Sequence, residues 1–380
     1  MKRSLGSMAL GTFALGIAEF GMMGILGDVA RDMYVGIATA GHLISAYSAG
    51  VAVGAPLLIV LRRMPLKHLM LLLAATIFAG NMAAALSPNF ITLLCARFVS
   101  GLPHGAFFGA GAIVCSRLAD KGHGAQAVAI MVGGMTVANV IGVPVATMLT
   151  NLFNWRICFA VVALAGFLAW LLMRLWLPWL APLPDTGIRG QFRFLRKREP
   201  WLIYGGVFFG QASVYCWLSY IEPIMTCVTG FSTADMTWIM MLAGAGMVAG
   251  NYISGRLADR YSASATTAVL ASMMVVVMPL VWLCSTMQVP SLILAFIATA
   301  GLFGIGGPLQ YLIVRYSRGG EMLGGAGIQI AFNVSNAMSA TLGGIAISAG
   351  LGLASPALIG APLAAIGAVC LWVLHGEHRD

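Results

Sequence analysis

Charged residues are scarce in this sequence. Asp, Glu, Lys and Arg make up only 9% of the 380 residues, whereas about a quarter of an ordinary soluble domain is charged. Hydrophobic residues make up 60%, which is more apolar surface than a soluble core can bury. The composition therefore excludes a soluble domain and predicts an all-α membrane protein.

The sequence also lacks the motifs of common enzymes and metal sites. It contains no HExxH, no GxSxG, no GxxxxGK[ST] and no paired carboxylates, so metalloproteases, serine hydrolases and P-loop nucleotide hydrolases are not indicated. Its seven cysteines lie in or beside apolar runs without a CxxC pair, which indicates neither a disulfide framework nor a zinc site. We expect a protein that is not an enzyme and needs no cofactor or metal.

A net charge of +9 could indicate a nucleic-acid partner. Such a partner is not expected here, because the basic residues lie in short turns between apolar runs and form no groove-sized stripe.

Twelve apolar runs are long enough to cross a bilayer, since a spanning helix needs roughly 20 residues. The expected spans are 5–26, 42–61, 68–87, 90–116, 126–149, 157–179, 201–221, 236–255, 265–285, 289–314, 323–350 and 354–374.

The placement of basic residues gives the orientation, because short cytoplasmic loops are enriched in Lys and Arg. With a cytoplasmic N-terminus, 18 of the 21 Lys and Arg residues fall on that side. The exceptions are Arg31 and Arg156 outside and Arg97 within a span. The sequence predicts a multi-pass protein of a bacterial inner membrane with both termini in the cytoplasm.

The longest polar segment divides the chain. Residues 181–200 carry Arg189, Arg193, Arg196, Lys197 and Arg198, and we interpret them as a basic, amphipathic cytoplasmic linker. A regulatory binding site in this segment is the alternative. The expected domains are an N-terminal six-helix bundle at 1–180 and a C-terminal six-helix bundle at 201–380.

The two halves resemble each other. AGVAVG at 49–54 matches AGMVAG at 245–250 with an offset of 196 residues, and Asn139 matches Asn333 with an offset of 194. Parallel six-span repeats related by a pseudo-two-fold axis are typical of transporters in which one half rocks against the other.

Few ionisable residues fall within the spans, and each is a functional candidate because a buried charge in the bilayer is costly. Glu19 and Arg97 each lie about seven residues from the outer end of a span, which predicts an ion pair. A carboxylate with an exchangeable partner can carry a proton; a permanent pair joining two helices is the alternative.

Other polar residues give less specific signals. His104 lies near mid-membrane and is a candidate for proton coupling or for a bond to a neighbouring helix. Glu222, beside Pro223, is a candidate for proton coupling or solute binding. The alternative is that it simply lies at the membrane–water interface. The remaining candidates could line a solute cavity or join helices; they are Asn139, Gln211, Tyr215, Asn251, Gln310, Gln329, Asn333 and Asn336.

Glycines recur at four-residue spacing at 101–109, 50–54 and 246–250, a pattern that favours close helix packing over phosphate binding. The sequence GRLADR at 255–260 lies at an inner turn, where Asp259 and Arg260 could lock helix ends as a cytoplasmic gate. A turn that only sets the topology is the alternative.

These motifs resemble the major facilitator superfamily. Gly255 to Arg260 is similar to its GxLaDR loop motif. RFVSG at 97–101 resembles the fourth-span motif, which implies a proton-transfer role for Arg97. GMTVANVIGVP at 134–144, which begins at Gly134, resembles the fifth-span antiporter motif of exporters, which implies that Gly142 and Pro144 bend that helix and seal it against leakage.

A narrower resemblance rests on GIAEFG at 16–21, GLPHGAFFG at 101–109 and QIAFN at 329–333. These look like the AraJ-type sugar (arabinose) efflux permeases of the drug:proton antiporter branch, along nearly the whole chain. One departure is Arg63, which stands where the first-half loop of the family usually has Asp.

The combined interpretation is a proton-coupled secondary transporter that exports a small solute, such as a sugar, nucleoside or drug-like molecule, by alternating access. Its partners are then the solute, protons and the lipid bilayer, and a monomer is expected because the pathway lies within one chain. The alternatives are a proton-driven importer of the same fold and a non-transporting membrane sensor or assembly partner.

Overall fold

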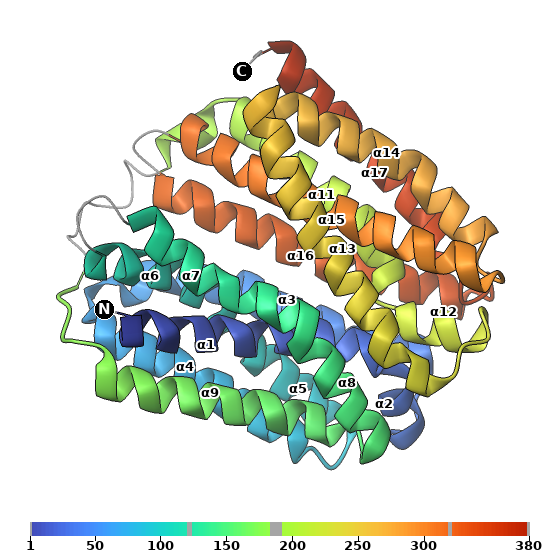
Figure 1. The fold of residues 1–380 in the computed structure, drawn as a ribbon, viewed down its shortest axis with the longest axis horizontal. Coiled ribbons are helices and arrows are strands. Elements are labelled where there is room, and N and C mark those ends of the chain that lie inside the picture. Colours follow the sequence, from blue (N-terminus) through green and yellow to red (C-terminus); the bar gives the residue numbers. More distant parts are fainter. Residues whose placement is uncertain (1, 120–123, 183–191, 318–320, 378–380) are drawn as a thin grey trace.

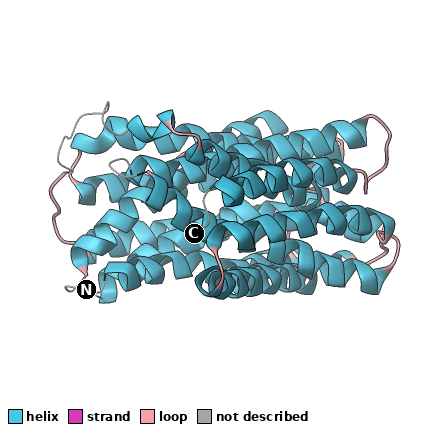
Figure 2. Cartoon of the chain, turned by 90° about the horizontal axis from the view of Figure 1, so that it is seen from above, coloured by secondary structure: helices cyan, strands magenta, loops and turns pink. Residues whose placement is uncertain are grey.

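The computed structural model describes residues 2–119, 124–182, 192–317 and 321–377. All regular secondary structure in these residues is helical (Figure 2). The all-α prediction is therefore confirmed.

The first half of the chain forms long helices interrupted by short irregular turns. Its elements are α1 (Lys2–Phe20), η1 (Gly21–Gly24), α2 (Leu26–Asp32), α3 (Ile37–Val60), η2 (Leu61–Arg63), α4 (Leu66–Ala85), α5 (Phe90–Gly101), α6 (Pro103–Leu118), α7 (Gly124–Val137), η3 (Ala138–Gly142), α8 (Val143–Leu152) and α9 (Arg156–Trp176).

The second half has fewer interruptions. Its elements are η4 (Arg193–Arg196), α11 (Glu199–Leu218), α12 (Ile221–Cys227), η5 (Thr233–Asp235), α13 (Met236–Arg260), α14 (Ala263–Leu283), α15 (Gln288–Tyr316), α16 (Glu321–Ser348) and α17 (Pro356–Glu377).

Within the described ranges, eleven helical stretches are long and apolar enough to cross a membrane. The one expected span that is not among these eleven, 201–221, corresponds to α11, which packs against α15, α16 and α17 inside the second half. Gly205, Gly206 and Gln211 lower its hydropathy. Most of its surface is covered by these helices, so it needs less apolar surface than a lipid-facing span.

Three of the expected spans are not single α-helices. α1 ends at Phe20 and continues through η1 into α2, and α5 gives way to α6 at Pro103. The fifth span contains the π-helical segment η3, which ends two residues before Pro144. Proline lacks the N–H that an α-helix needs at that turn, and a π-helical segment is one way to absorb the loss.

The two halves lie on opposite sides of the molecule, with α1–α9 below and α11–α17 above in Figure 1. The repeated glycines have the same packing role in both. A Cβ on Gly54 would lie 1.8 Å from the carbonyl oxygen of Leu102, and a Cβ on Gly250 would lie 1.9 Å from that of Ala300. Glycine therefore lets α3 touch α6, and α13 touch α15, backbone to backbone.

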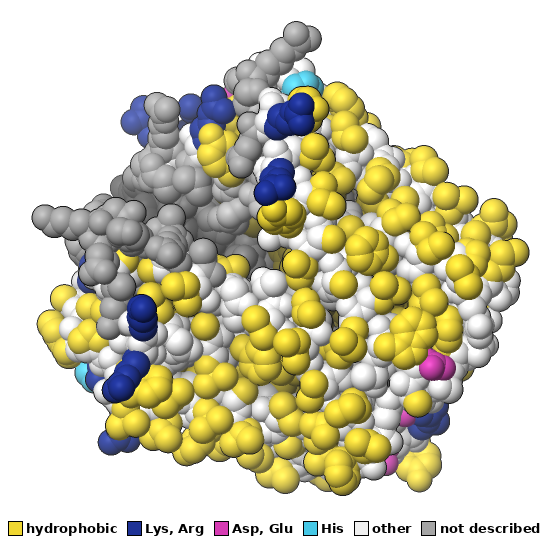
Figure 3. Space-filling model, viewed as in Figure 1, with side chains coloured by type: hydrophobic (Ala, Val, Ile, Leu, Met, Phe, Trp, Pro, Cys, Tyr) yellow, Lys and Arg dark blue, Asp and Glu magenta, His cyan; other side chains and the backbone are white. Residues whose placement is uncertain are grey.

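The surface is mainly apolar around the middle of the molecule, as expected for lipid-facing helices (Figure 3). On the face shown, most Lys and Arg side chains gather toward the end at which α1 begins. The Asp and Glu side chains visible there lie toward the opposite end. The boundaries of the two bundles at 180 and 200 remain a prediction, and residues 183–191 of the expected linker lie outside the described part.

Candidate functional site

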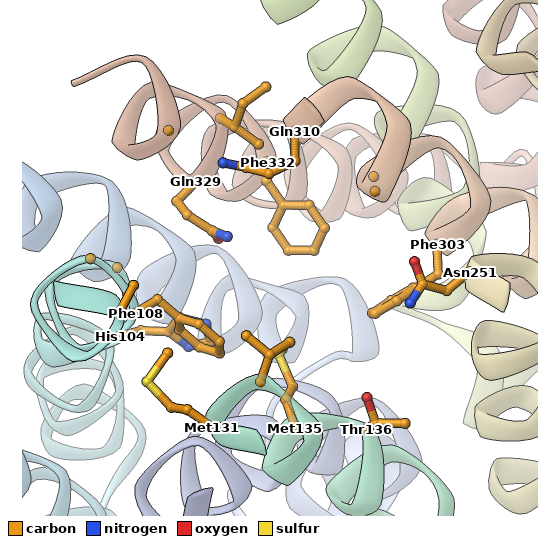
Figure 4. A pocket seen from close by; sticks show the side chains of 18 of the residues that line it. His104, Phe108, Met131, Met135, Thr136, Asn251, Phe303, Gln310, Gln329 and Phe332 are labelled. Carbon is orange, nitrogen blue, oxygen red and sulfur yellow. The ribbon is translucent and has the colours of Figure 1, made fainter. Parts of the chain in front are cut away.

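A cavity of about 1010 Å³ lies between the two halves. Helices α6 and α7 with η3 supply one wall, and α11, α13, α15 and α16 supply the other (Figure 4). It extends from His104 at mid-depth to Arg117 in the last turn of α6 and Gly325 in the first turns of α16. The cavity therefore reaches the end of the molecule at which α1 begins and α17 ends.

The walls combine amide and aromatic side chains. Six of the polar residues singled out in the sequence line the cavity: His104, Asn139, Gln211, Asn251, Gln310 and Gln329. Phe108, Phe303 and Phe332 face them together with Met131 and Met135 (Figure 4). Arg117 is the only Asp, Glu, Lys or Arg among the residues described as lining it. This surface suits a neutral solute with hydrogen-bonding groups.

Four of the expected lining residues lie elsewhere. Tyr215, Asn333 and Asn336 are completely or almost completely buried between helices and do not reach the cavity wall, and Glu222 lies at the far end of the molecule in α12. Sequence position gives the depth of a residue in the bilayer but not the direction in which its side chain points.

The halves touch directly at the end opposite the termini. The hydroxyl of Ser45 in α3 donates to the carbonyl of Ala337 in α16 at 2.9 Å. The amide of Asn151 in α8 donates to the carbonyl of Thr233 in η5 at 3.0 Å. The cavity is thus closed at this end and continues toward the other.

Glu19 lies in a buried cluster at the deep end of the cavity. The residue is 1% exposed, and neither carboxylate oxygen has a hydrogen-bond partner. The nearest basic atom is Nε2 of His104, at 3.8 Å. The side-chain amide of Asn336, from α16 in the second half, is the other polar group beside the carboxylate.

Arg97 does not form the direct ion pair with Glu19 that equal depth predicted. Its Nη1 donates to the carbonyl of Ala18 at 2.8 Å, and its Nε donates to the carbonyl of Leu43 at 3.3 Å. The backbone before Glu19, and not the carboxylate, is within reach of the guanidinium. The two charged groups therefore interact through space without touching.

Tyr47 belongs to this cluster and was not among the residues predicted from the sequence. Its hydroxyl lies 2.8 Å from Nδ1 of His104, and its ring lies 4.4 Å from the guanidinium carbon of Arg97. The cation–π contact gives the buried charge partial compensation. A tyrosine inside a largely apolar span was the available signal.

The antiporter-like segment packs against the first span. A Cβ on Gly134 would meet the carbonyl oxygen of Ala9 at 1.9 Å, and one on Gly142 would meet Ile17 at 2.8 Å. Pro144 stands in the first turn of α8, directly after the π-helical segment. These residues fix the shape of the span beside Glu19; their role in sealing the pathway remains a prediction.

The expected cytoplasmic gate lies at the C-terminal end of α13. Gly255 and Arg260 are part of this helix, and the guanidinium carbon of Arg260 lies 5.4 Å from the ring of Tyr261. The side chain of Asp259 lies outside the described part, so the gate also remains a prediction. Among the described residues, no three His, Cys, Asp or Glu side chains gather where they could hold a metal ion.

Comparison with known proteins decides the family. The model of the Major Facilitator Superfamily matches residues 8–327. The chain belongs to the Major Facilitator Superfamily. It is therefore a multi-pass membrane transporter and not an enzyme.

Individual relatives agree with this family. The chain is 44% identical to the transporter AraJ of Escherichia coli (strain K12), over all of this chain and 96% of AraJ. It is 27% identical to a protein named as a sugar efflux transporter of Helicobacter pylori (strain G27), over 93% of this chain and 90% of that protein.

A solved structure shares the fold. It is a bacterial homolog of the human lysosomal transporter Spinster in an inward-facing and occupied conformation. The TM-score is 0.76 at 14% identity, over 99% of this chain and 97% of the other. The expected superfamily fold is confirmed.

Proposed function

We propose that this transporter exports a small neutral solute by alternating access, in exchange for protons that bind Glu19. One observation carries the proposal: a buried carboxylate with no hydrogen-bond partner lies 3.8 Å from a histidine that lines the cavity between the halves. A structural ion pair would hold that carboxylate in a fixed contact. An unpartnered carboxylate can instead exchange a proton when its surroundings change.

His104 connects the carboxylate to the cavity. Its Nε2 faces Glu19 and its Nδ1 faces the Tyr47 hydroxyl, so a proton or solute hydroxyl that reaches the ring influences Glu19 directly. Arg97 holds the backbone of α1 and supplies a positive field. We assign the coupling to Glu19, with His104 and Arg97 as its positioning residues.

The closed end of the molecule is the periplasmic end in this proposal. Both termini and the open cavity then face the cytoplasm of a bacterial inner membrane, consistent with the basic side chains at that end. Solute enters from the cytoplasm, the halves rock, and a proton from outside displaces the solute by protonating Glu19.

The cavity walls favour a polyhydroxylated or otherwise neutral polar solute. Amide groups donate and accept hydrogen bonds, and aromatic rings pack against the apolar faces of sugars and drug-like molecules. The similarity to the Helicobacter pylori protein named as a sugar efflux transporter supports sugars as the first class to test.

Two measurements test this function. A thermal-shift screen of the purified protein against sugars, nucleosides and neutral drugs identifies a solute. Everted membrane vesicles with an acidified lumen should then accumulate that solute, and a protonophore should abolish accumulation. Depletion of the lumen under the same gradient would indicate an importer, and absence of flux under any gradient would indicate a sensor.

A further inference from the structure

The phenol of Tyr220 lies between the two halves at the closed end of the molecule. Helix α3 of the first half and helix α16 of the second pack against each other across the boundary (Figure 1). Tyr220, in the turn between α11 and α12, is completely buried beside this contact. Its hydroxyl donates a hydrogen bond to the carbonyl of Ala340 in α16, at 2.6 Å. The phenol is therefore attached to the second half.

A glycine of α3 allows the same hydroxyl to touch the first half. A Cβ on Gly41 would lie 2.0 Å from the hydroxyl oxygen of Tyr220 and 2.8 Å from its Cζ. Both distances are far below van der Waals contact, so the phenol lies directly on the backbone of α3. Gly41 thus forms a socket for the tip of the Tyr220 side chain.

The phenol is held in place from the α16 side. A Cβ on Gly343 would lie 2.7 Å from Cε2 of Tyr220, and a Cβ on Gly344 would lie 2.8 Å from its hydroxyl oxygen. The hydrogen bond to Ala340 fixes this oxygen as well. A side chain added at position 41 would therefore meet a group that cannot move aside, and the strain would fall on the contact between α3 and α16.

The contact between Tyr220 and Gly41 must separate when the closed end opens, because the two residues belong to different halves. The hydrogen bond from Tyr220 to Ala340 lies within the second half and does not have to break. The fit of the phenol against Gly41 therefore stabilises the closed conformation and adds nothing to the open one. Such a difference between two conformations is what shifts their equilibrium.

We propose that Tyr220 and Gly41 form a plug and socket that keep this end of the transporter closed, and so favour the conformation whose cavity opens toward the termini. The inference rests on the proposed function in one respect, namely that the halves rock between two conformations. Tyr220 does not line the cavity, so it is a positioning residue for the transport cycle and not a solute-binding residue.

The test measures a distance across the closed end of the purified full-length protein in lipid nanodiscs. Spin labels are attached at Leu86→Cys after α4 and at Met287→Cys before α15, one exposed turn position in each half. The cysteines that are not buried are first replaced by serine; they are Cys95, Cys227, Cys284 and Cys370. Electron–electron double resonance then gives the ratio of open to closed molecules.

The variant is Gly41→Ala, and Gly54→Ala is its matched control. A Cβ at position 54 would lie 1.8 Å from the carbonyl oxygen of Leu102. Both of these residues belong to the first half, so that clash is the same whether the end is open or closed. We expect Gly41→Ala to raise the open-to-closed ratio about tenfold, because it overpacks the closed conformation selectively. Gly54→Ala should keep the parental ratio even though the protein is less stable.

Two further variants locate the effect in the phenol. Tyr220→Phe removes the oxygen that would lie 2.0 Å from the added Cβ and leaves Cζ at 2.8 Å. Adding it to Gly41→Ala should therefore lower the open-to-closed ratio at least about threefold. Gly344→Ala brings a Cβ to 2.8 Å from the same oxygen and 3.2 Å from the carbonyl oxygen of Ala38 in α3. It should also raise the ratio, and it takes the place of Gly41→Ala if that variant does not fold.

The plug and socket are overturned if Gly41→Ala keeps the parental ratio. They are also overturned if Gly54→Ala raises the ratio as much as Gly41→Ala does, because the effect would then be a general loosening of the helices. A ratio that does not fall when Tyr220→Phe is added would exclude the phenol as the plug. No solute or pH gradient is used, so failure of proton-driven export would be seen separately from failure of this proposal.

Discussion

The guanidinium of Arg97 donates a hydrogen bond to the carbonyl of Ala18, at 2.8 Å, and does not contact Glu19, the next residue along the chain. Arg97 therefore fixes the backbone that carries the carboxylate while leaving the carboxylate itself unbonded. This arrangement combines a constant positive field with a side chain whose partner can change. A direct ion pair would have removed that freedom.

The geometry around Arg97 predicts that lysine cannot replace it. A single ammonium cannot donate from two directions to the carbonyls of Ala18 and Leu43 as the planar guanidinium does. We expect Arg97→Lys to lower proton-driven flux at least about tenfold, since hydrogen bonds from charged groups are worth roughly 1.5–3 kcal/mol. Flux in proteoliposomes measures this. Arg174→Lys, at the end of α9, is the control and should retain parental flux.

Much of the fold followed from hydropathy and charge. The span expected at 157–179 is α9 at Arg156–Trp176, and the span expected at 265–285 is α14 at Ala263–Leu283. Apolar length determines such helices because the bilayer core has a fixed thickness. The break at Pro103 was not predicted, and a bend in the fifth span was expected only from its resemblance to a family motif, because such breaks depend on how neighbouring helices accommodate a missing N–H.

The glycine contacts predict a position-specific effect on stability. Gly54→Ala places a Cβ 1.8 Å from the backbone carbonyl of Leu102, which cannot move without shifting α6. We expect a loss of about 1–3 kcal/mol in stability, as for other overpacked interiors. Thermal unfolding in detergent measures the loss. Gly133→Ala, where a Cβ meets nothing within 4 Å, should unfold as the parent does; equal unfolding of both variants would contradict the packing argument.

The ion pair between Asp32 and Arg156 predicts a small, pH-dependent effect. Hydrogen bonds from Arg156 and then from Trp155 hold the pKa of Asp32 below its ordinary value of 3.8. The lowered pKa means that the pair stabilises the fold above about pH 4 and that this contribution is lost as the pH falls through the folded-state pKa. Because the Asp32 side chain is 49% exposed, we expect Asp32→Asn to cost only about 0.5 kcal/mol at neutral pH.

Thermal unfolding of the parent and Asp32→Asn across an acid titration checks this sign. The difference between them should shrink as the solution is acidified. A difference that grows with acidification would contradict the assignment.

The cavity predicts which side chains affect solute affinity. Gln329 faces the cavity from α16 (Figure 4), so Gln329→Ala should raise KM for the best solute of the screen about five- to tenfold, the worth of one neutral hydrogen bond. The maximal rate should change little, because Gln329 is not part of the Glu19 cluster. Gln288→Ala, at the exposed start of α15, is the control. An unchanged KM in Gln329→Ala would exclude this residue from the solute site.

The candidate site was only partly predictable. Glu19, Arg97 and His104 were identified because ionisable groups are rare within spans, and the structure brings these three together. Their actual contacts depend on helix rotation, which also buries Asn336 and Tyr215 away from the cavity wall and brings Tyr47 into the cluster. The helices are apolar on nearly all sides. The sequence therefore does not specify how each helix is rotated about its own axis, because no polar face marks the side that points inward.

The central claim is that Glu19 carries the coupled proton, and Glu19→Gln tests it most directly. The amide keeps the size of the side chain but cannot exchange a proton. In proteoliposomes with an imposed pH gradient, we predict that Glu19→Gln abolishes proton-driven solute accumulation while solute binding, measured by thermal shift, is retained. Accumulation at the parental rate in Glu19→Gln would contradict the account.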